Sequence, residues 1–116
     1  MNIFKSIFFS ESLKGKIIRI ENEIKQLVML VCKEKFWIEK YGAYDIDPKN
    51  LVFWICVQTD KVKKELENNS NLENDIKFLL DKYNYPKSAR KHLHIGFESQ
   101  ETVNRESQGD WYLHFK

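Results

Sequence analysis

The longest regular pattern in the sequence is a stripe of apolar residues in its first third. These residues recur mostly at steps of three and four: Leu13, Ile17, Ile20, Ile24, Leu27, Val31, Ile38 and Tyr41. Residues three and four positions apart share one face of an α-helix, so we predict one helix of about 30 residues that begins near Ser10 and Glu11. Lys40 and Gly42 are typical of its end, because glycine adopts a left-handed conformation there without a steric penalty.

The width of this stripe decides between two interpretations of the helix. Its spacing is also that of a coiled-coil seam, which would make the protein a structural homodimer. Further apolar residues beside the stripe widen it: Ile18, Val28, Met29, Leu30, Phe36 and Trp37. A helix packed on a sheet needs such a wide stripe. We therefore favour packing on the chain's own sheet and keep the homodimer as an alternative.

The rest of the chain shows strand and helix patterns in turn. Leu51–Val57 is apolar at every position, which indicates a central strand covered on both faces. Two shorter helices are predicted after it, at 61–68 and 72–83. Alternation of apolar with polar or small residues then predicts two strands, 92–98 and 111–115.

These elements predict an α+β fold in one domain, residues 1–116. We expect a long N-terminal helix packed on a three-stranded, mostly antiparallel sheet, in which the last two strands pair antiparallel. The central strand would reach those two through a two-helix crossover. The polar stretch Ser99–Asp110 would be the connection between the last two strands.

The composition fits a globular domain with a substantial core. Of the 116 residues, 42% are apolar and 31% are charged, which excludes disordered and low-complexity classes. The 19 basic residues nearly balance the 17 acidic ones, so nothing favours a nucleic-acid partner. No apolar run approaches the ~20 residues that cross a membrane, and Ile3–Phe9 is too short for a signal peptide. We therefore expect a cytoplasmic protein with no membrane partner.

Three histidines give the most specific chemical signal. On a strand, His92 and His94 would leave the same face, and His114 would join them if the last two strands paired with their apolar faces inward. Three imidazoles on neighbouring strands could bind zinc or another divalent metal in a small hydrolase. Solvent-facing strand positions are polar in any case, so we expect no metal and keep the metal-dependent hydrolase as an alternative.

Other catalytic arrangements are less well supported. Cys32 and Cys56 lie in separate apolar segments, which predicts buried, unpaired thiols of a reducing compartment. Asp45 and Asp47 precede Pro48, and hydrogen bonding within a turn explains them more simply than a bound cation does. The sequence contains neither a glycine-rich phosphate loop nor a nucleophile elbow. We therefore expect no enzymatic activity and no cofactor.

Acidic residues make the stretch Ser99–Asp110 negatively charged, and Arg105 is the one basic residue within it. Such a stretch suits a solvated loop or a surface complementary to a basic partner. A tyrosine follows it, and tyrosine brings a large contact area with few rotatable bonds. The predicted partner-binding residues are therefore Glu98, Glu101, Glu106, Asp110 and Tyr112.

Three stretches carry a resemblance: YGAYDIDPKNLVFWI at 41–55, FESQETVNRE at 97–106 and GDWY at 109–112. With them the chain resembles small uncharacterised bacterial single-domain proteins, some of which are immunity proteins that neutralise a toxin encoded beside them. The resemblance implies a bacterial binding protein whose partner is a toxin domain. It contains no catalytic motif and assigns no functional residue.

The sequence thus predicts a non-enzymatic protein-binding module, with toxin immunity as the specific hypothesis. Two alternatives come from other classes of protein. One is a metal-dependent hydrolase built on His92, His94 and His114, and the other is a structural homodimer formed through the long helix.

Overall fold

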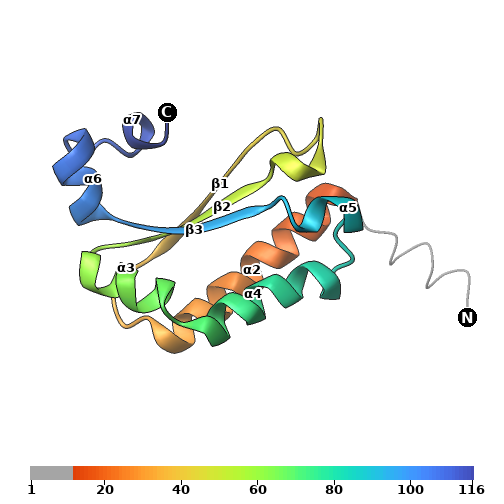
Figure 1. Ribbon diagram of the computed structural model, residues 1–116, viewed down its shortest axis with the longest axis horizontal. Helices are drawn as coiled ribbons and strands as arrows, with labels where there is room; N and C mark the ends of the chain where they lie inside the picture. The colour runs from red at the N-terminus through yellow and green to blue at the C-terminus, as the bar shows by residue number, and fades with distance from the viewer. Residues whose placement is uncertain (1–11) are drawn as a thin grey trace, which may run out of the picture.

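A sheet of three strands organises residues 12–116, the part of the chain that this computed structural model describes. The strands are β1 (Trp37–Tyr41), β2 (Val52–Val57) and β3 (His94–Ser99). β1 pairs antiparallel with β2, and β2 pairs parallel with β3, so the sheet is mixed. β2 is the central strand, and β1 and β3 are the two edges (Figure 1).

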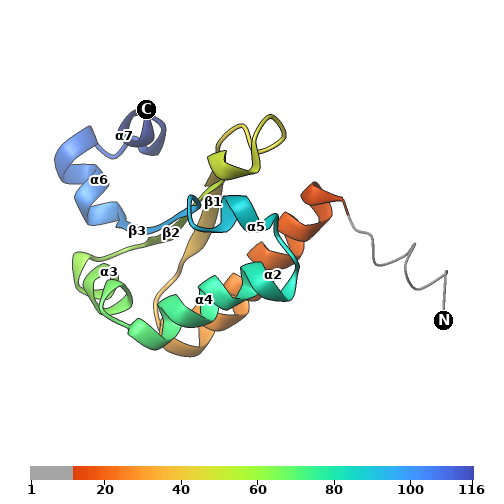
Figure 2. The same ribbon diagram turned by 45° about the vertical axis from the view of Figure 1, so that its right-hand side comes forward.

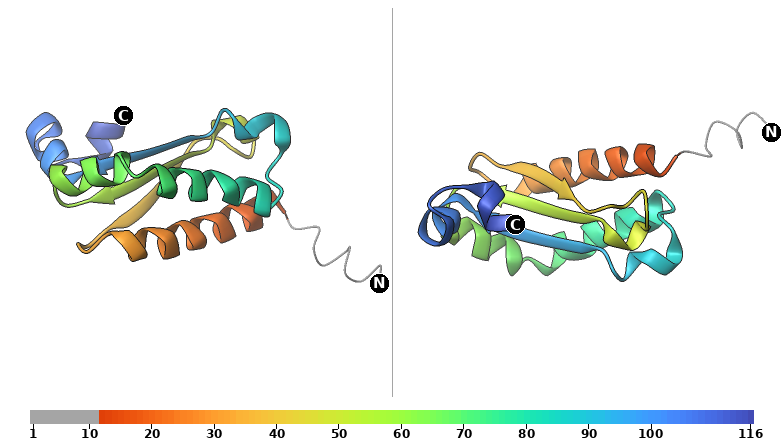
Figure 3. Two further views of the ribbon diagram at one scale, coloured as in Figure 1. Left: turned by 60° about the horizontal axis from the view of Figure 1, so that its bottom comes forward. Right: turned by 90° about the horizontal axis from the view of Figure 1, so that it is seen from above.

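Helices cover the two faces of the sheet unequally. They are α2 (Leu13–Val31), α3 (Asp60–Glu67), α4 (Ser70–Lys82), α5 (Lys87–Arg90), α6 (Gln100–Ser107) and α7 (Trp111–Phe115), with a 3-10 turn, η1 (Pro48–Asn50), before β2. α2 and α4 lie side by side along one face (Figures 1 and 2). On the other face, α6 and α7 cover one end of the sheet (Figure 3).

The hydrophobic core fills the space between the sheet and the pair α2 and α4. Side chains that are fully buried or nearly so come from α2, from β2 and from α4: Ile17, Ile20, Ile24, Val28, Phe53, Ile55, Val57 and Ile76. Each such burial stabilises the fold by about 1.5–3 kcal/mol before conformational entropy is counted. The stripe that predicted the helix faces this core, so the seam that a coiled coil would use is buried within the chain.

The first helix is shorter than predicted. It has Ser12 as its N-cap and ends at Val31, whereas residues 37–41 form β1; the predicted start at Ser10 lies outside the described residues. The break has a physical cause, because the Glu34 carboxylate accepts hydrogen bonds from the backbone N–H of Gln58 and Thr59 at the end of β2. A helix running on through Glu34 could not make these contacts.

Gly42 also has a different role from the predicted one. It lies directly after β1 with φ of +100°, and a Cβ placed there would come within 1.8 Å of the Asn50 carbonyl oxygen. The residue is therefore needed for the close approach of the chain between β1 and β2. It does not end a helix.

The C-terminal prediction was wrong as well. Residues 111–115 form helix α7 instead of a strand, and the predicted polar connection contains helix α6. Each helix has a side-chain cap: the Ser99 hydroxyl accepts from the N–H of Thr102, and the Asp110 carboxylate accepts from the N–H of Leu113. Such caps satisfy backbone donors that a helix leaves unpaired at its start. The last two strands therefore do not pair antiparallel, and the third strand of the sheet is β1.

The broader fold prediction is confirmed. The chain has the α+β class, a long N-terminal helix packed on a three-stranded sheet among residues 12–116, and a helical crossover from the central strand to β3. The helices predicted at 61–68 and 72–83 correspond to α3 and α4. The apolar run at Leu51–Val57 contains the central strand.

Replacing Glu34 with alanine tests the contact that separates α2 from β1. The change leaves two backbone donors at the end of β2 without their partner, so we expect a loss of about 1–3 kcal/mol in the free energy of unfolding. Urea denaturation followed by circular dichroism measures it. Glu65→Ala, at an exposed position of α3, is the matched control and should change stability by less than about 0.5 kcal/mol. Equal effects of the two substitutions would contradict this role of Glu34.

Candidate functional site

β3 has one edge that no other strand of residues 12–116 covers. The N–H of His94 donates to the Leu51 carbonyl next to β2, and His94 aligns with Val52. In a parallel ladder, backbone groups point alternately toward the two sides of a strand. The N–H and C=O of Ile95 and Phe97 therefore point away from β2. We call these four groups the open edge of β3.

A groove of about 920 Å³ runs along this open edge. Its apolar wall comes from α4 and from the strand itself: Ile76, Leu80, Leu93, Ile95 and Phe97. Leu93, Ile95 and Phe97 are half-buried, whereas Ile76 and Leu80 are buried in the core. The groove therefore offers both unpaired backbone groups and accessible apolar surface, the two features that an added strand uses. We call it the edge groove.

Charged side chains line the rim of the edge groove, and most of them are paired within the chain. On α4, Lys77 Nζ lies 2.8 Å from Glu73 Oε1. Arg90 Nη1 of α5 lies 2.6 Å from Asp81 Oδ1 of α4. On α3, Lys63 lies 2.8 Å from Glu98. These pairs leave little net charge on the rim.

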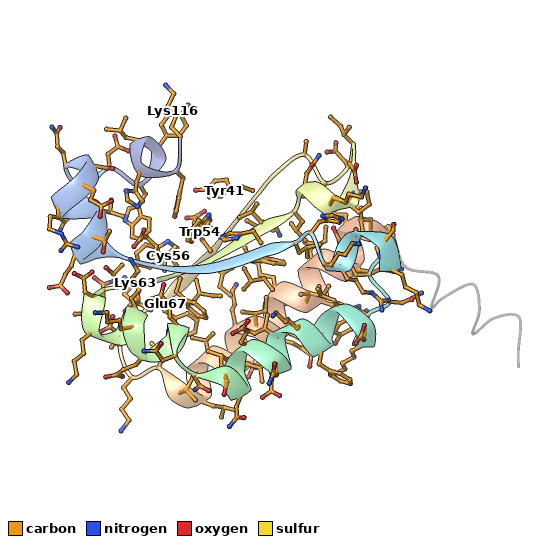
Figure 4. All side chains as sticks on the ribbon, viewed as in Figure 1. Tyr41, Trp54, Cys56, Lys63, Glu67 and Lys116 are labelled. Atoms are coloured by element: carbon orange, nitrogen blue, oxygen red, sulfur yellow. The ribbon has the colours of Figure 1, made fainter. Side chains whose placement is uncertain are left out.

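Two further residues of the rim have no such partner. Neither Lys91 nor Glu67 forms an ion pair with another described residue, and both are exposed. Lys91 lies just before β3 begins. Glu67 lies one helical turn beyond Lys63, on α3 near the end of β3 (Figure 4). The groove therefore has a positive charge at one end and a negative charge at the other.

Aromatic rings border the edge groove on the outer face of the sheet. The Trp54 ring lies against His94, with ring centroids 5.0 Å apart. It also lies over Gly96, where an added Cβ would come within 2.6 Å of the ring. Because Gly96 carries no side chain, the Trp54 ring reaches the groove at the middle of β3. A side chain entering from solvent can contact the ring there.

The C-terminal arm, α6 and α7, closes one end of the outer face. The Trp111 ring meets Trp37 edge-on at a centroid distance of 5.0 Å, and the Phe115 ring stacks on Trp54 at 4.8 Å. α6 is also tied to α3, because the Asp60 carboxylate accepts hydrogen bonds from Ser99, Thr102 and Arg105. These hydrogen bonds, that from Ser99 first, hold the pKa of Asp60 well below its usual range.

Glu98, a predicted partner-binding residue, is buried under this arm. Its carboxylate lies 2.8 Å from both Lys63 Nζ and His114 Nε2, and it also accepts from the N–H of Ser99. Burial alone would raise the pKa of Glu98, but the hydrogen bonds from Lys63 and His114 outweigh it and hold the pKa below its ordinary value. In this structure Glu98 joins β3 to the C-terminal arm, and only 8% of the residue is exposed.

The other predicted partner-binding residues are all exposed on the C-terminal arm, and two of them also make hydrogen bonds within the chain. The Glu101 carboxylate accepts from the N–H of Asp60, and Asp110 caps α7. Glu106 is exposed on α6, and Tyr112 is 75% exposed on α7. Of the five predicted residues, Glu98 alone is withdrawn from solvent.

The three histidines of the metal hypothesis lie in different surroundings. His92 is in the turn before β3, His94 lies against Trp54, and His114 contacts Glu98 and, at 2.9 Å, the Ser107 hydroxyl. Within residues 12–116, no group of three or more His, Cys, Asp or Glu side chains is placed to hold a metal ion. The arrangement that the alternative requires, three imidazoles on paired strands, is not formed.

Ser107, His114 and Glu98 form a hydrogen-bonded line that is reminiscent of a hydrolase triad. Ser107, however, ends α6, and a helix C-terminus presents carbonyl oxygens, which repel an oxyanion. The line is better suited to fixing α7 on the sheet than to nucleophilic catalysis.

The prediction that both thiols are buried and unpaired is confirmed. Cys32 and Cys56 are buried and unpaired. Burial raises the pKa of the Cys56 thiol to about 12, so this sulfur stays protonated and unreactive at neutral pH.

No family model matches the chain, and neither a curated protein nor a solved structure matches it. None of the helices within residues 12–116 combines the length and apolar character needed to cross a membrane.

Replacing Glu98 with glutamine should lower stability at neutral pH and flatten its response to acid. Folding favours the carboxylate, so its contribution is fully present above the ordinary pKa of 4.5 and is lost as pH falls through the lower folded-state value. We expect a loss of about 1–3 kcal/mol at pH 7 in urea denaturation. The difference from wild type should narrow as the pH falls below 4.5.

Glu106→Gln, at an exposed position of α6, is the matched control and should follow the wild-type curve at every pH. A Glu98→Gln curve that stays parallel to wild type down to acidic pH would contradict the assigned role of this carboxylate.

Proposed function

We propose that this protein is a non-enzymatic protein-binding module whose partner adds an extended segment to β3 as a further strand. The observation that carries the proposal is the open edge of β3 above an apolar groove. Extended peptides bind other domains in this way: backbone hydrogen bonds hold the segment, and pockets select its alternate side chains.

The energetics of the open edge support strand addition. Exposed edges promote pairing with another chain, and proteins commonly blunt them with charges, proline or a covering element. The β3 residues that face the groove, Ile95 and Phe97, are apolar, and α4 forms the opposite wall of the groove. Each backbone hydrogen bond adds about 0.5–1.5 kcal/mol net, and burial of the partner's apolar side chains against the half-buried Leu93, Ile95 and Phe97 adds the larger share.

Toxin immunity remains the specific form of the proposal. Its support is the resemblance carried by residues 41–55, 97–106 and 109–112, which implies a toxin domain as the partner. The exposed Glu106 and Tyr112 stay proposed as a second contact with a basic partner. The buried thiols fit a reducing compartment, so a cytoplasmic location is part of the same proposal.

Ile95→Pro tests whether the partner uses the open edge. Proline removes the outward N–H of residue 95 but leaves the ladder bond of His94 to β2 intact, and edge strands accept proline at such positions. Ile95→Ala is the matched control, because it also loses the isoleucine side chain but keeps the N–H. The partner to be tested is the product of the gene adjacent to that of this protein.

We expect the proline variant to bind that product at least about tenfold more weakly than the alanine variant in calorimetry, because it loses a hydrogen bond and its ring blocks the edge. Both variants should keep the wild-type circular dichroism spectrum. Equal binding by the two variants would contradict strand addition at β3. Failure of the wild-type protein to bind the product, or to protect cells that express it, would refute toxin immunity for that pair.

A further inference from the structure

The charges at the two ends of the edge groove select the direction and the sequence of its occupant. From them we infer that the bound segment runs antiparallel to β3, with a basic residue at its N-terminal end, an acidic residue at its C-terminal end and apolar residues at alternate positions between. This inference rests on the proposed strand addition and names the segment that the edge groove recognises.

The direction follows from the relative stability of strand pairings. β3 already pairs parallel with β2, a geometry imposed by the helical crossover between them. A separate segment has no such connection to satisfy. Antiparallel pairing is slightly more stable per residue and occurs more often, so a separate segment adopts it.

The end charges follow from Lys91 and Glu67. An antiparallel segment starts near the end of β3, beside Glu67 on α3, and finishes near the start of β3, beside Lys91. Because neither residue has an ion-pair partner among residues 12–116, a basic N-terminal residue and an acidic C-terminal residue complement them. The other rim charges are paired within the chain and give no preference.

The alternation between the two ends follows from the strand geometry. Residues opposite Phe97 and Ile95 share the face of those side chains, so they point toward Ile76 and Leu80 of α4. They should be apolar and β-branched. The residue opposite Gly96 points to the outer face, where it meets the ring of Trp54.

Two synthetic peptides of identical composition test the inference on the full chain. Acetyl-KTVTVTD-amide has the proposed order, and acetyl-DTVTVTK-amide is its exact reversal. Titration into the ¹⁵N-labelled protein gives the dissociation constants, and the shifted amides identify the site. We expect the first peptide to bind about fivefold more tightly, with the largest shifts at Ile95 and Phe97, because two end ion pairs replace two like-charge contacts.

A charge-exchanged variant, Glu67→Lys with Lys91→Glu, should reverse this preference. The same two peptides with both valines N-methylated lack the two N–H groups that would donate to the Ile95 and Phe97 carbonyls, so they should not bind to either protein. Equal binding of the two unmethylated peptides, or tighter binding of the reversed one, would overturn the direction and charge assignment and leave strand addition standing.

Binding that survives N-methylation, or no binding by either unmethylated peptide, would overturn strand addition itself and with it the proposed function. A second copy of the chain is the competing occupant. A dimer in sedimentation velocity that neither peptide dissociates would show that a second copy covers the edge groove, and it would overturn the inference.

Discussion

The alternation of backbone groups along β3 is the constraint on which the functional account depends. Parallel pairing uses the groups of every second residue toward β2, which leaves those of Ile95 and Phe97 directed outward. No strand among residues 12–116 pairs with them, and α4 below provides apolar side chains at the same place. The outward direction of these backbone groups therefore determines both where a further strand can form hydrogen bonds and where the groove lies.

The C-terminal arm leaves this edge open, because it covers a different part of the sheet. α7 places Trp111 and Phe115 on the rings of Trp37 and Trp54, and the contact between His114 and Glu98 fixes it there. These contacts bury part of the outer face near the end of β3. The side of β3 that faces away from β2 stays open, and the half-buried Leu93, Ile95 and Phe97 remain accessible to a partner.

The sequence could predict what local patterns determine. The wide stripe on α2, the apolar run of β2 and the two crossover helices followed from side-chain periodicity. Residues 32–41 were assigned wrongly to the helix because Ile38 and Tyr41 continue the helical spacing. The contact that ends α2 joins Glu34 to Thr59, which lies 25 positions further along the chain. WYLHF at 111–115 fits a strand as well as a short helix, and the cap at Asp110 decides between them. The edge groove could not be predicted from local sequence, since an unpaired edge depends on strand order. The acidic pattern likewise could not show that Glu98 is buried.

Amide hydrogen exchange along β3, measured by NMR on the full chain, shows whether the edge of this strand is open. The N–H groups of Gly96 and Glu98 point to β2, so they should exchange slowly, whereas those of Ile95 and Phe97 point to the open edge and should exchange fast. The account predicts this alternation of slow and fast amides from residue 95 to residue 98. Uniform protection of all four amides would show that the edge is already paired, and it would contradict the account.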